Sequence, residues 1–526
     1  MADQRKEQDE TEITVDHEEN VQQEQPAEAL WREVLKHWRV LLWCLLIFLL
    51  PMNFGYENAI VGNLLAMPQF LERFGHQVNG TWVLSARDQQ ILNGALSVGV
   101  FCAAIITGFL SDAYGRKKAM MIGSIICCAG AMVQHYATSI LMLFGGKVVA
   151  TLGFGIGHSV APVFVSELAP SSLRGICLAL INTMIVGGQW LASLTVYGST
   201  FRSDADAWRV PLICQIIPPG IVFLAAGTIL PESPTWFLIK DRRDEARKAF
   251  QRFNGPHFDS GPALNHTLAA IVVEKENASG NHSWIECFQQ PNLRRTTIVV
   301  MTYLAQQLIG VNFIAGYLAY YYALAGVNHP VAIAQQSYAI QVFGNMCSWP
   351  LIERVGRRRL MVGGCIMMTT MLPVIGGISI LNTPTALKVT VALMTVWGFL
   401  YQATLGACAY AIGGEIPSPA VRQKTYALNM VATTISSTVV YQLMPILINS
   451  DKANLGGKIA FVFFAPSVPM CFYLFFCLPE TRGRSFDELE EMFQARVPSR
   501  KFKSYQTSLT PAAVLEGKLE GDIGTA

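Results

Sequence analysis

Apolar stretches long enough to cross a bilayer recur along the chain, with short polar breaks between them. A helix needs about 20 mainly apolar residues to span the hydrocarbon core of a membrane. By this criterion the pattern predicts twelve membrane-spanning helices, at residues 38–66, 90–111, 119–138, 141–165, 176–199, 210–230, 297–325, 335–353, 360–381, 387–413, 425–448 and 457–478.

The composition supports the same class of protein. Of the 526 residues, 52% are hydrophobic and 14% are charged, whereas soluble domains carry about 25% charged residues. We therefore expect an all-α membrane protein surrounded by the lipid bilayer. The net charge of +2 gives no indication of a nucleic-acid partner. We find no metal-ligand spacing, phosphate-binding loop or nucleophile–base group in the sequence, so we expect no metal, no cofactor and no enzymatic activity.

Polar segments divide the chain into five parts. We predict a disordered cytoplasmic tail at residues 1–37, a six-helix bundle at 38–231, a cytoplasmic loop with short amphipathic helices at 232–296, a second six-helix bundle at 297–479, and a cytoplasmic tail at 480–526. The first tail is rich in Glu and Gln and lacks the short apolar core of a signal peptide.

Basic residues concentrate in alternate loops. They follow the second, eighth and tenth predicted spans, as Arg116–Lys118, Arg357–Arg359 and Arg422 with Lys424, whereas the loops after the third, seventh and ninth spans have almost none. Because cytoplasmic loops carry the excess of Lys and Arg, both termini are predicted to lie inside the cell. Asn79, in an Asn-Gly-Thr sequence, then lies in an outer loop and is a predicted glycosylation site.

The seventh predicted span carries an unusual number of amide side chains. Gln306, Gln307 and Asn312 lie in its first half, with Gly310 between the glutamines and the asparagine. In a regular helix Gln307 and Asn312 would lie roughly 140° apart, so a break at Gly310 is needed to direct all three toward one cavity. Amides that hold helices together are the alternative. The number of amides, with the following aromatic run, favours a polyhydroxy ligand.

An acid lies inside the first predicted span. Glu57 is surrounded by apolar sequence, and Lys147 in the fourth span is a candidate partner. Ionisable residues within the membrane often mark proton or ion pathways, although a structural ion pair is the alternative. A pairing that breaks and reforms during transport would couple transport to a proton.

The chain also contains an internal repeat. Three motifs occur twice, in the same order and at nearly one displacement: SELAPSSLRG at 166–175 with GEIPSPAVRQ at 414–423, PESP at 231–234 with PETR at 479–482, and DAYGRKK at 112–118 with ERVGRRR at 353–359. Two homologous halves of six spans predict two bundles on either side of a central path.

These motifs together resemble a known family. From residues 38 to 503 the chain resembles the sugar porters of the major facilitator superfamily, through GRKK and GRRR, SELAPSSLRG, PESPTWFL, QQLIGVN, GEIPSPAVR and PETRGRSFDELEEMF. Within that family, AYAIGGEIPSPAVRQKTYALN, GYLAYYYALAG, INTMIVGGQW and VPSRKF are similar to the fungal α-glucoside (maltose-type) permeases. The resemblance implies the major facilitator fold.

The resemblance implies a central sugar site. Amides donate and accept hydrogen bonds and so suit hydroxyl groups, while a flat ring can cover an apolar sugar face. Taken singly, each residue is equally consistent with a contact between helices. The family pattern assigns substrate binding to Asn182, Gln189, Gln306, Gln307, Asn312, Tyr317, Gln341 and Tyr410.

The resemblance also implies a gate of charged residues. They would pair between the bundles when the cytoplasmic side is closed and separate when it opens. Solvated charges that only set the topology are the alternative. The residues concerned are Asp112, Arg116, Glu167, Arg174, Glu232, Glu353, Arg357, Glu415, Arg422 and Glu480.

Some positions depart from the family pattern. Ala113 replaces the usual arginine of the first loop motif, and Phe54 and Val100 stand where maltose-type proton symporters have acids. Glu57 and Lys147 occupy the positions of the family's aspartate and arginine. The chain thus keeps one acid and one base that would serve proton symport, but it lacks the two further acids of the maltose-type symporters.

We therefore expect a monomeric, multi-pass plasma-membrane transporter. It would import a mono- or disaccharide, such as maltose or a hexose, by alternating access with proton symport. A facilitator, or a carrier of quinate, a polyol or lactose, is one alternative. A sugar sensor that does not transport is another.

Overall fold

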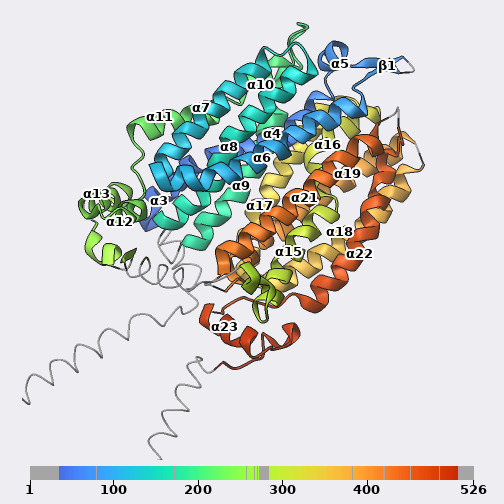
Figure 1. The fold of residues 1–526 in the computed structure, drawn as a ribbon. Coiled ribbons are helices and arrows are strands. Elements are labelled where there is room, and N and C mark those ends of the chain that lie inside the picture. Colours follow the sequence, from blue (N-terminus) through green and yellow to red (C-terminus); the bar gives the residue numbers. More distant parts are fainter. Residues whose placement is uncertain are drawn as a thin grey trace, which may run out of the picture.

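Twelve membrane-length helical segments form the body of the protein, in two bundles that lie side by side (Figure 1). The computed structural model describes residues 35–507 except 79, 170–172, 256–257, 266, 269–270, 272–283, 382, 419–420, 450–451 and 485. The first bundle contains α3 (Trp38–Ile47) with α4 (Leu49–Leu64), α6 (Ala86–Tyr114), α7 (Arg116–His135), α8 (Ile140–Leu168), α9 (Arg174–Ser199), and α10 (Arg209–Cys214) with α11 (Ile217–Thr228).

The second bundle repeats this arrangement. It contains α15 (Asn292–Leu308) with α16 (Val311–Leu324), α17 (Pro330–Val355), α18 (Arg357–Ser379), α19 (Pro384–Tyr401) with the π-helical turn η2 (Gln402–Gly406) and α20 (Ala407–Glu415), α21 (Arg422–Ile448), and α22 (Ile459–Cys477), which the short turn η4 (Gly456–Lys458) precedes.

The helices account for the twelve spans that the hydropathy pattern predicts. Within the described residues, nine helices are by themselves long and apolar enough to cross a membrane, and the pair α3–α4, bent by 43°, makes a tenth. The other two segments are α15–α16 and α17, which carry buried amides. The prediction of an all-α membrane protein with two six-helix bundles is confirmed.

Smaller elements mark the two ends of the bundles. The hairpin end carries α5 (Pro68–Phe74) and the antiparallel strands β1 (His76–Val78) and β2 (Thr81–Val83). The opposite, short-helix end carries α12 (Pro234–Ile239), α13 (Arg243–Asn254) and α23 (Phe486–Gln494) (Figure 1). The turns η1 (Trp284–Phe288) and η5 (Ser499–Lys501) complete the described elements.

Side-chain caps begin several spans at the hairpin end. Ser85, Ser139 and Thr383 each accept a hydrogen bond from the backbone N–H three residues later, which satisfies a donor that the first turn of a helix leaves unpaired. At the short-helix end, Gly115 and Gly356 turn the chain with φ of 96° and 94°. Such positive angles favour glycine and end one span just before the next begins.

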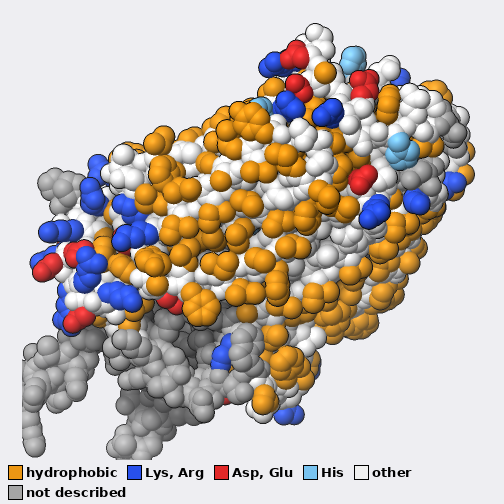
Figure 2. Space-filling view, turned by 45° about the horizontal axis from the view of Figure 1, so that its top comes forward, with side chains coloured by type: hydrophobic (Ala, Val, Ile, Leu, Met, Phe, Trp, Pro, Cys, Tyr) orange, Lys and Arg blue, Asp and Glu red, His pale blue; other side chains and the backbone are white. Residues whose placement is uncertain are grey.

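The outer surface is apolar between these ends. Figure 2 shows hydrophobic side chains over the flanks of the bundles and charged side chains gathered toward the ends. Phe109 and Leu141 are 80% and 71% exposed, which is a high exposure for large apolar side chains and fits contact with lipid.

The short helices dock onto the spans nearest to them. Phe253 of α13 makes edge contacts with Trp43 of α3 and Phe164 of α8. On the other bundle, Arg295 at the start of α15 pairs with Glu490 of α23 at 2.6 Å. Each bundle thus has a helix fixed across its short-helix end.

The seventh span is broken where the sequence analysis places the break. α15 ends at Leu308, α16 begins at Val311, and Gly310 between them has a φ of 98°. A Cβ atom at Gly310 would lie 3.0 Å from the ring of Phe463. Both the backbone angle and the space require glycine here.

We predict that Gly310→Ala lowers the stability of the protein by about 1–3 kcal/mol, because alanine is strained at this φ. Thermal unfolding of the purified protein in detergent measures the change. The control is Gly363→Ala in α18, where a Cβ atom meets nothing within 4 Å. Equal midpoints for the two variants would contradict the account of the break.

Candidate functional site

The break at Gly310 brings the amides of the seventh span together. Nδ2 of Asn312 donates to Oε1 of Gln307 at 2.7 Å, although a continuous helix would hold them well apart. Nε2 of Gln306 donates to the carbonyl of Leu405 in η2 at 3.0 Å. All three side chains are buried. The break at Gly310 thus brings Gln307 and Asn312 into contact, whereas a shared ligand cavity for all three amides stays a prediction.

Amides of the first bundle meet amides of the second at mid-height. In α9, the hydroxyl of Thr183 donates to Oδ1 of Asn345 in α17 at 2.6 Å, and Nδ2 of Asn182 approaches Oε1 of Gln402 in η2 at 3.4 Å. These hydrogen bonds cross the boundary between the bundles. They place the polar group of the first bundle against that of the second.

Several buried amides in this region keep unused hydrogen-bonding capacity. Oε1 of Gln189, Nε2 of Gln341 and Nδ2 of Asn345 are buried without a hydrogen-bond partner among the described residues. Buried polar atoms without partners are costly, so atoms of this kind mark places where a polar ligand gains hydrogen bonds. Gln341 lies against Gly398 of α19, within the second bundle.

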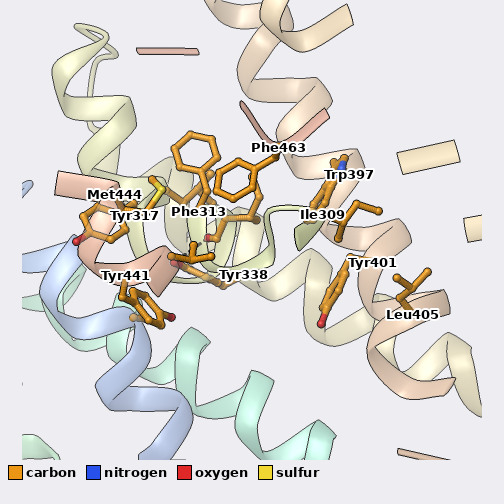
Figure 3. Close-up of a cluster of buried hydrophobic side chains, with 14 of the residues drawn as sticks. Ile309, Phe313, Tyr317, Tyr338, Trp397, Tyr401, Leu405, Tyr441, Met444 and Phe463 are labelled. Atoms are coloured by element: carbon orange, nitrogen blue, oxygen red, sulfur yellow. Dashed lines mark hydrogen bonds between the residues drawn. The ribbon is translucent and has the colours of Figure 1, made fainter. Parts of the chain in front are cut away.

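Aromatic rings surround the broken helix. Figure 3 shows Phe313, Tyr338 and Phe463 gathered near the start of α16, with Trp397 and Tyr401 on α19. Trp397 and Tyr401 are stacked, with ring planes 3° apart and centroids 5.7 Å apart. Flat rings beside amides suit a ligand with both hydroxyl groups and apolar ring faces.

The two predicted tyrosines contact residues other than these amides. The hydroxyl of Tyr317 accepts a hydrogen bond from Asn93 of α6, so Tyr317 contributes to the contact between the bundles at the hairpin end. Tyr410 is partly exposed, and its ring packs edge-on against Tyr303 with centroids 5.7 Å apart.

The sequence analysis missed Thr183, Asn345 and Gln402. Asn345 lies one helical turn beyond Gln341 on the same face of α17, so helical spacing could have found it. Gln402 lies in η2, and π-helical turns are frequent at functional sites, but the apolar sequence around it does not indicate one.

The bundles are sealed at the hairpin end. Five pairs of residues from α4, α6, α16, α21 and the chain after α21 form hydrogen bonds across the boundary: Gln89 with Asn449, Gln90 with Gln442, Asn93 with Tyr317, Ser97 with Thr438, and Asn58 with Tyr441. The bonds are 2.5–2.9 Å long.

The predicted acid–base pair of the first bundle is present. Nζ of Lys147 forms an ion pair with Oε2 of Glu57, and both side chains are almost fully buried. Nε2 of Gln134 donates to Oε1 of Glu57 at 3.2 Å. A cavity of about 10 Å³ borders Gln134 and Lys147, which is close to the space that one water molecule needs. The carboxylate is thus held by two donors in a nearly dry site.

The charged motifs at the short-helix end form the same structure twice. Arg116 pairs with Glu167 at 2.9 Å and Arg357 with Glu415 at 3.1 Å. Each glutamate also accepts a hydroxyl hydrogen bond, Glu167 from Ser233 and Glu415 from Thr481. The repeat of the sequence is therefore also a repeat of side-chain contacts.

Two further acids anchor the loops of these motifs. Oε1 of Glu232 accepts from the backbone of Lys117 at 3.0 Å, and Oε1 of Glu480 accepts from the backbone of Arg357 at 2.9 Å. Asp112 is 82% exposed and lies 3.7 Å from Arg116.

The pairs Asp112–Arg116, Arg116–Glu167 and Arg357–Glu415 each lie within one bundle. Pairing between the bundles thus stays a prediction for a conformation closed at this end. Four predicted residues lie outside what the structure describes: the whole of Asn79 and the side chains of Arg174, Glu353 and Arg422.

The family model described as "Sugar (and other) transporter" matches residues 5–493. The chain belongs to this family. The general alpha-glucoside permease of Saccharomyces cerevisiae is 29% identical over 491 residues, covering 91% of this chain and 79% of that protein. A high glucose sensor of the same yeast is 28% identical over 454 residues, covering 84% of this chain and 59% of the sensor.

The fold is that of a solved transporter. The proton:xylose symporter XylE from E. coli, of the major facilitator superfamily, matches with a TM-score of 0.69 and 17% identity, covering 87% of this chain and 98% of that chain. The resemblance to sugar porters is confirmed. The relatives are transporters and a sensor, in agreement with the expectation that this protein is not an enzyme.

We predict that Arg116→Gln destabilises the protein by about 3–5 kcal/mol, because it leaves the buried carboxylate of Glu167 without its cation. The matched control is Arg242→Gln, which removes the exposed pair with Glu245 and should cost at most about 1 kcal/mol. Thermal unfolding in detergent compares the two. Similar losses would contradict a structural role for the buried pair.

Proposed function

We propose that this member of the sugar transporter family imports an α-glucoside such as maltose by proton-coupled alternating access. The observation that carries the proposal is the group of buried amides at mid-height, to which both bundles contribute. A site shared between two bundles is exposed to one side or the other as the bundles tilt. The family supports sugar as the substrate, and the alpha-glucoside permease among the relatives supports an α-glucoside.

Binding would exchange contacts between the bundles for contacts with the sugar. The long Asn182–Gln402 contact and the Thr183–Asn345 hydrogen bond are the ones that hydroxyl groups would replace. The remaining predicted residues would contribute to the same site: Gln189, Gln306, Gln307, Asn312, Tyr317, Gln341 and Tyr410. The stacked rings of Trp397 and Tyr401 suit the apolar face of a second sugar ring.

The conformation described here is closed at the hairpin end. We assign this end to the outside of the plasma membrane and the short-helix end to the cytoplasm, in keeping with the basic loops. Opening toward the outside would break the hydrogen bonds of α6 with α21. It would bring the charged motifs of Glu167 and Glu415 from opposite bundles together, as the predicted gate requires.

Glu57 would carry the coupling proton. Its carboxylate contacts Nζ of Lys147 and accepts a hydrogen bond from Gln134. Protonation would release Lys147 and alter the packing of α4 against α8. The proton:xylose symporter with the same fold supports coupling of this kind.

The proposal also includes the predicted oligomeric state, glycosylation site and segment limits. The protein would act as a monomer, Asn79 would be glycosylated on the outer side, and the limits of the five chain segments would be those given above.

A sugar sensor is the second candidate, because one relative is a high glucose sensor. Turnover of sugar by the purified protein distinguishes transporter from sensor.

We predict that Glu57→Gln abolishes uphill accumulation of maltose while exchange of labelled for unlabelled maltose across the membrane continues. The reason is that glutamine cannot release a proton, so the two half-cycles lose their link to the proton gradient. Uptake and counterflow in proteoliposomes with an imposed pH gradient measure both activities. The control is Glu72→Gln, the same change at an exposed acid of α5. Concentrative uptake by Glu57→Gln would refute the coupling proposal.

We also predict that a disulfide between Ser97→Cys and Thr438→Cys stops transport and that a reducing agent restores it. The two hydroxyl oxygens are 2.7 Å apart on opposite bundles, so cysteines there fit a disulfide that holds the hairpin end closed. The readout is maltose uptake before and after oxidation.

The control for this experiment is a cross-link within one bundle. The hydroxyl groups of Ser337 and Thr395 are also 2.7 Å apart, and both lie in the second bundle. The Ser337→Cys/Thr395→Cys protein should transport equally well oxidised or reduced. Undiminished uptake with the Ser97–Thr438 cross-link formed would rule out separation of the bundles at this end.

A further inference from the structure

A group of basic side chains lies on the second bundle at the short-helix end, beside the end of α22. Arg354 and Arg359 flank the start of α18 and are exposed, and Arg482 follows α22. Arg500, Lys501 and Lys503 belong to the segment after α23 and are exposed as well. The seventh member is Arg358, which is partly buried.

The chain after α23 folds back to place Arg500 at this position. Ser499 donates to the carbonyl of Cys477, the last residue of α22, at 2.6 Å and accepts from Arg294 at 2.9 Å. The guanidinium of Arg500 then lies over the rings of Phe475 and Phe476, 4.8 and 4.5 Å from their centroids. Arg500, which is far from every membrane span in the sequence, is thus held against the membrane helix α22.

Arg358 brings a second guanidinium to the same point. Its Nη2 donates to the carbonyl of Phe475 at 2.8 Å, while its Nε is buried without a hydrogen-bond partner among the described residues. Arg358 and Arg500 thus both contact Phe475, the first at its carbonyl and the second at its ring, so two positive charges lie at one residue of α22.

The acid Glu480 has backbone partners. Its Oε1 accepts from the backbone N–H groups of Arg357 at 2.9 Å and Arg482 at 3.3 Å. The fold therefore holds two guanidinium groups at Phe475, while Glu480 accepts hydrogen bonds from backbone N–H groups. Basic residues that only set the membrane topology do not need to be held together in this way. Arg500 belongs to the segment after α23, and a solvated side chain there would set the topology equally well.

The neighbouring surface is apolar and faces lipid. Phe472, Phe475 and Phe476 are 61%, 43% and 55% exposed and share one face of α22 by their spacing. The two arginines lie where this apolar face ends, and basic side chains at the end of a membrane helix are expected near the lipid headgroups. Basic pockets between membrane helices bind anionic headgroups at this depth.

We propose that the phosphate of an anionic phospholipid binds between Arg358 and Arg500, with its acyl chains along Phe472, Phe475 and Phe476. The phosphate would accept from the unpaired Nε of Arg358 and offset the repulsion between the two cations. This site needs only the membrane fold, so a failure of the transport proposal would not affect it. It ties the segment after α23 to the membrane surface.

The test measures lipid binding to the purified full-length protein by native mass spectrometry. Phosphatidylserine, phosphatidylcholine and inorganic phosphate are added separately. We expect the wild type to prefer phosphatidylserine to phosphatidylcholine, and Arg358→Gln/Arg500→Gln to lose that preference by about tenfold or more. Arg252→Gln, which removes one positive charge from an exposed site on α13 and so matches Arg500→Gln alone, should keep it. Arg500→Lys should keep most of it.

Several results would overturn the proposal. They are an absence of preference in the wild type, an unchanged preference in the double variant, or an equal loss in Arg252→Gln. Binding of inorganic phosphate that depends on the same two arginines and displaces phosphatidylserine would show a free-anion site instead. If the double variant is not folded, Arg500→Gln alone gives the comparison, because that side chain is exposed.

Discussion

Amide side chains inside a membrane span need hydrogen-bond partners, because hydrocarbon supplies none. The break at Gly310 decides where the seventh span finds them. It turns Asn312 onto Gln307 and leaves Gln306 free to reach the backbone of η2 in the tenth span. Without the break, these groups would lie on different faces and need separate partners. The break thus determines which partners the three amides of the seventh span meet.

Closure at the hairpin end uses the same chemistry. Each hydrogen bond between α6 and the second bundle contributes about 1 kcal/mol net, so together they favour the closed end by several kcal/mol. A transporter must populate both conformations, so the opposite end needs contacts of comparable strength when it closes. The duplicated motifs of Glu167 and Glu415 are suited to this, since their partly buried ion pairs already position the charged loops.

The sequence predicts the twelve helices, the two halves and the Glu57–Lys147 pair, because each depends on local hydropathy or on a strong charge constraint. The sequence does not predict the hydrogen-bond partners of the amides. The contacts of Asn182 with Gln402 and of Thr183 with Asn345 depend on how far two bundles tilt, and spacing along the chain does not fix that. The position of Tyr317 in the sequence likewise does not predict that its hydroxyl accepts a hydrogen bond from Asn93.

The central claim is that this protein moves an α-glucoside together with a proton. The most direct measurement is uptake of labelled maltose and of labelled glucose by yeast cells that lack their own sugar permeases, with and without a protonophore. The account predicts concentrative maltose uptake that collapses when the protonophore is added. Maltose entry that only equilibrates and ignores the protonophore, or absence of maltose uptake by protein shown to be at the cell surface, would contradict it.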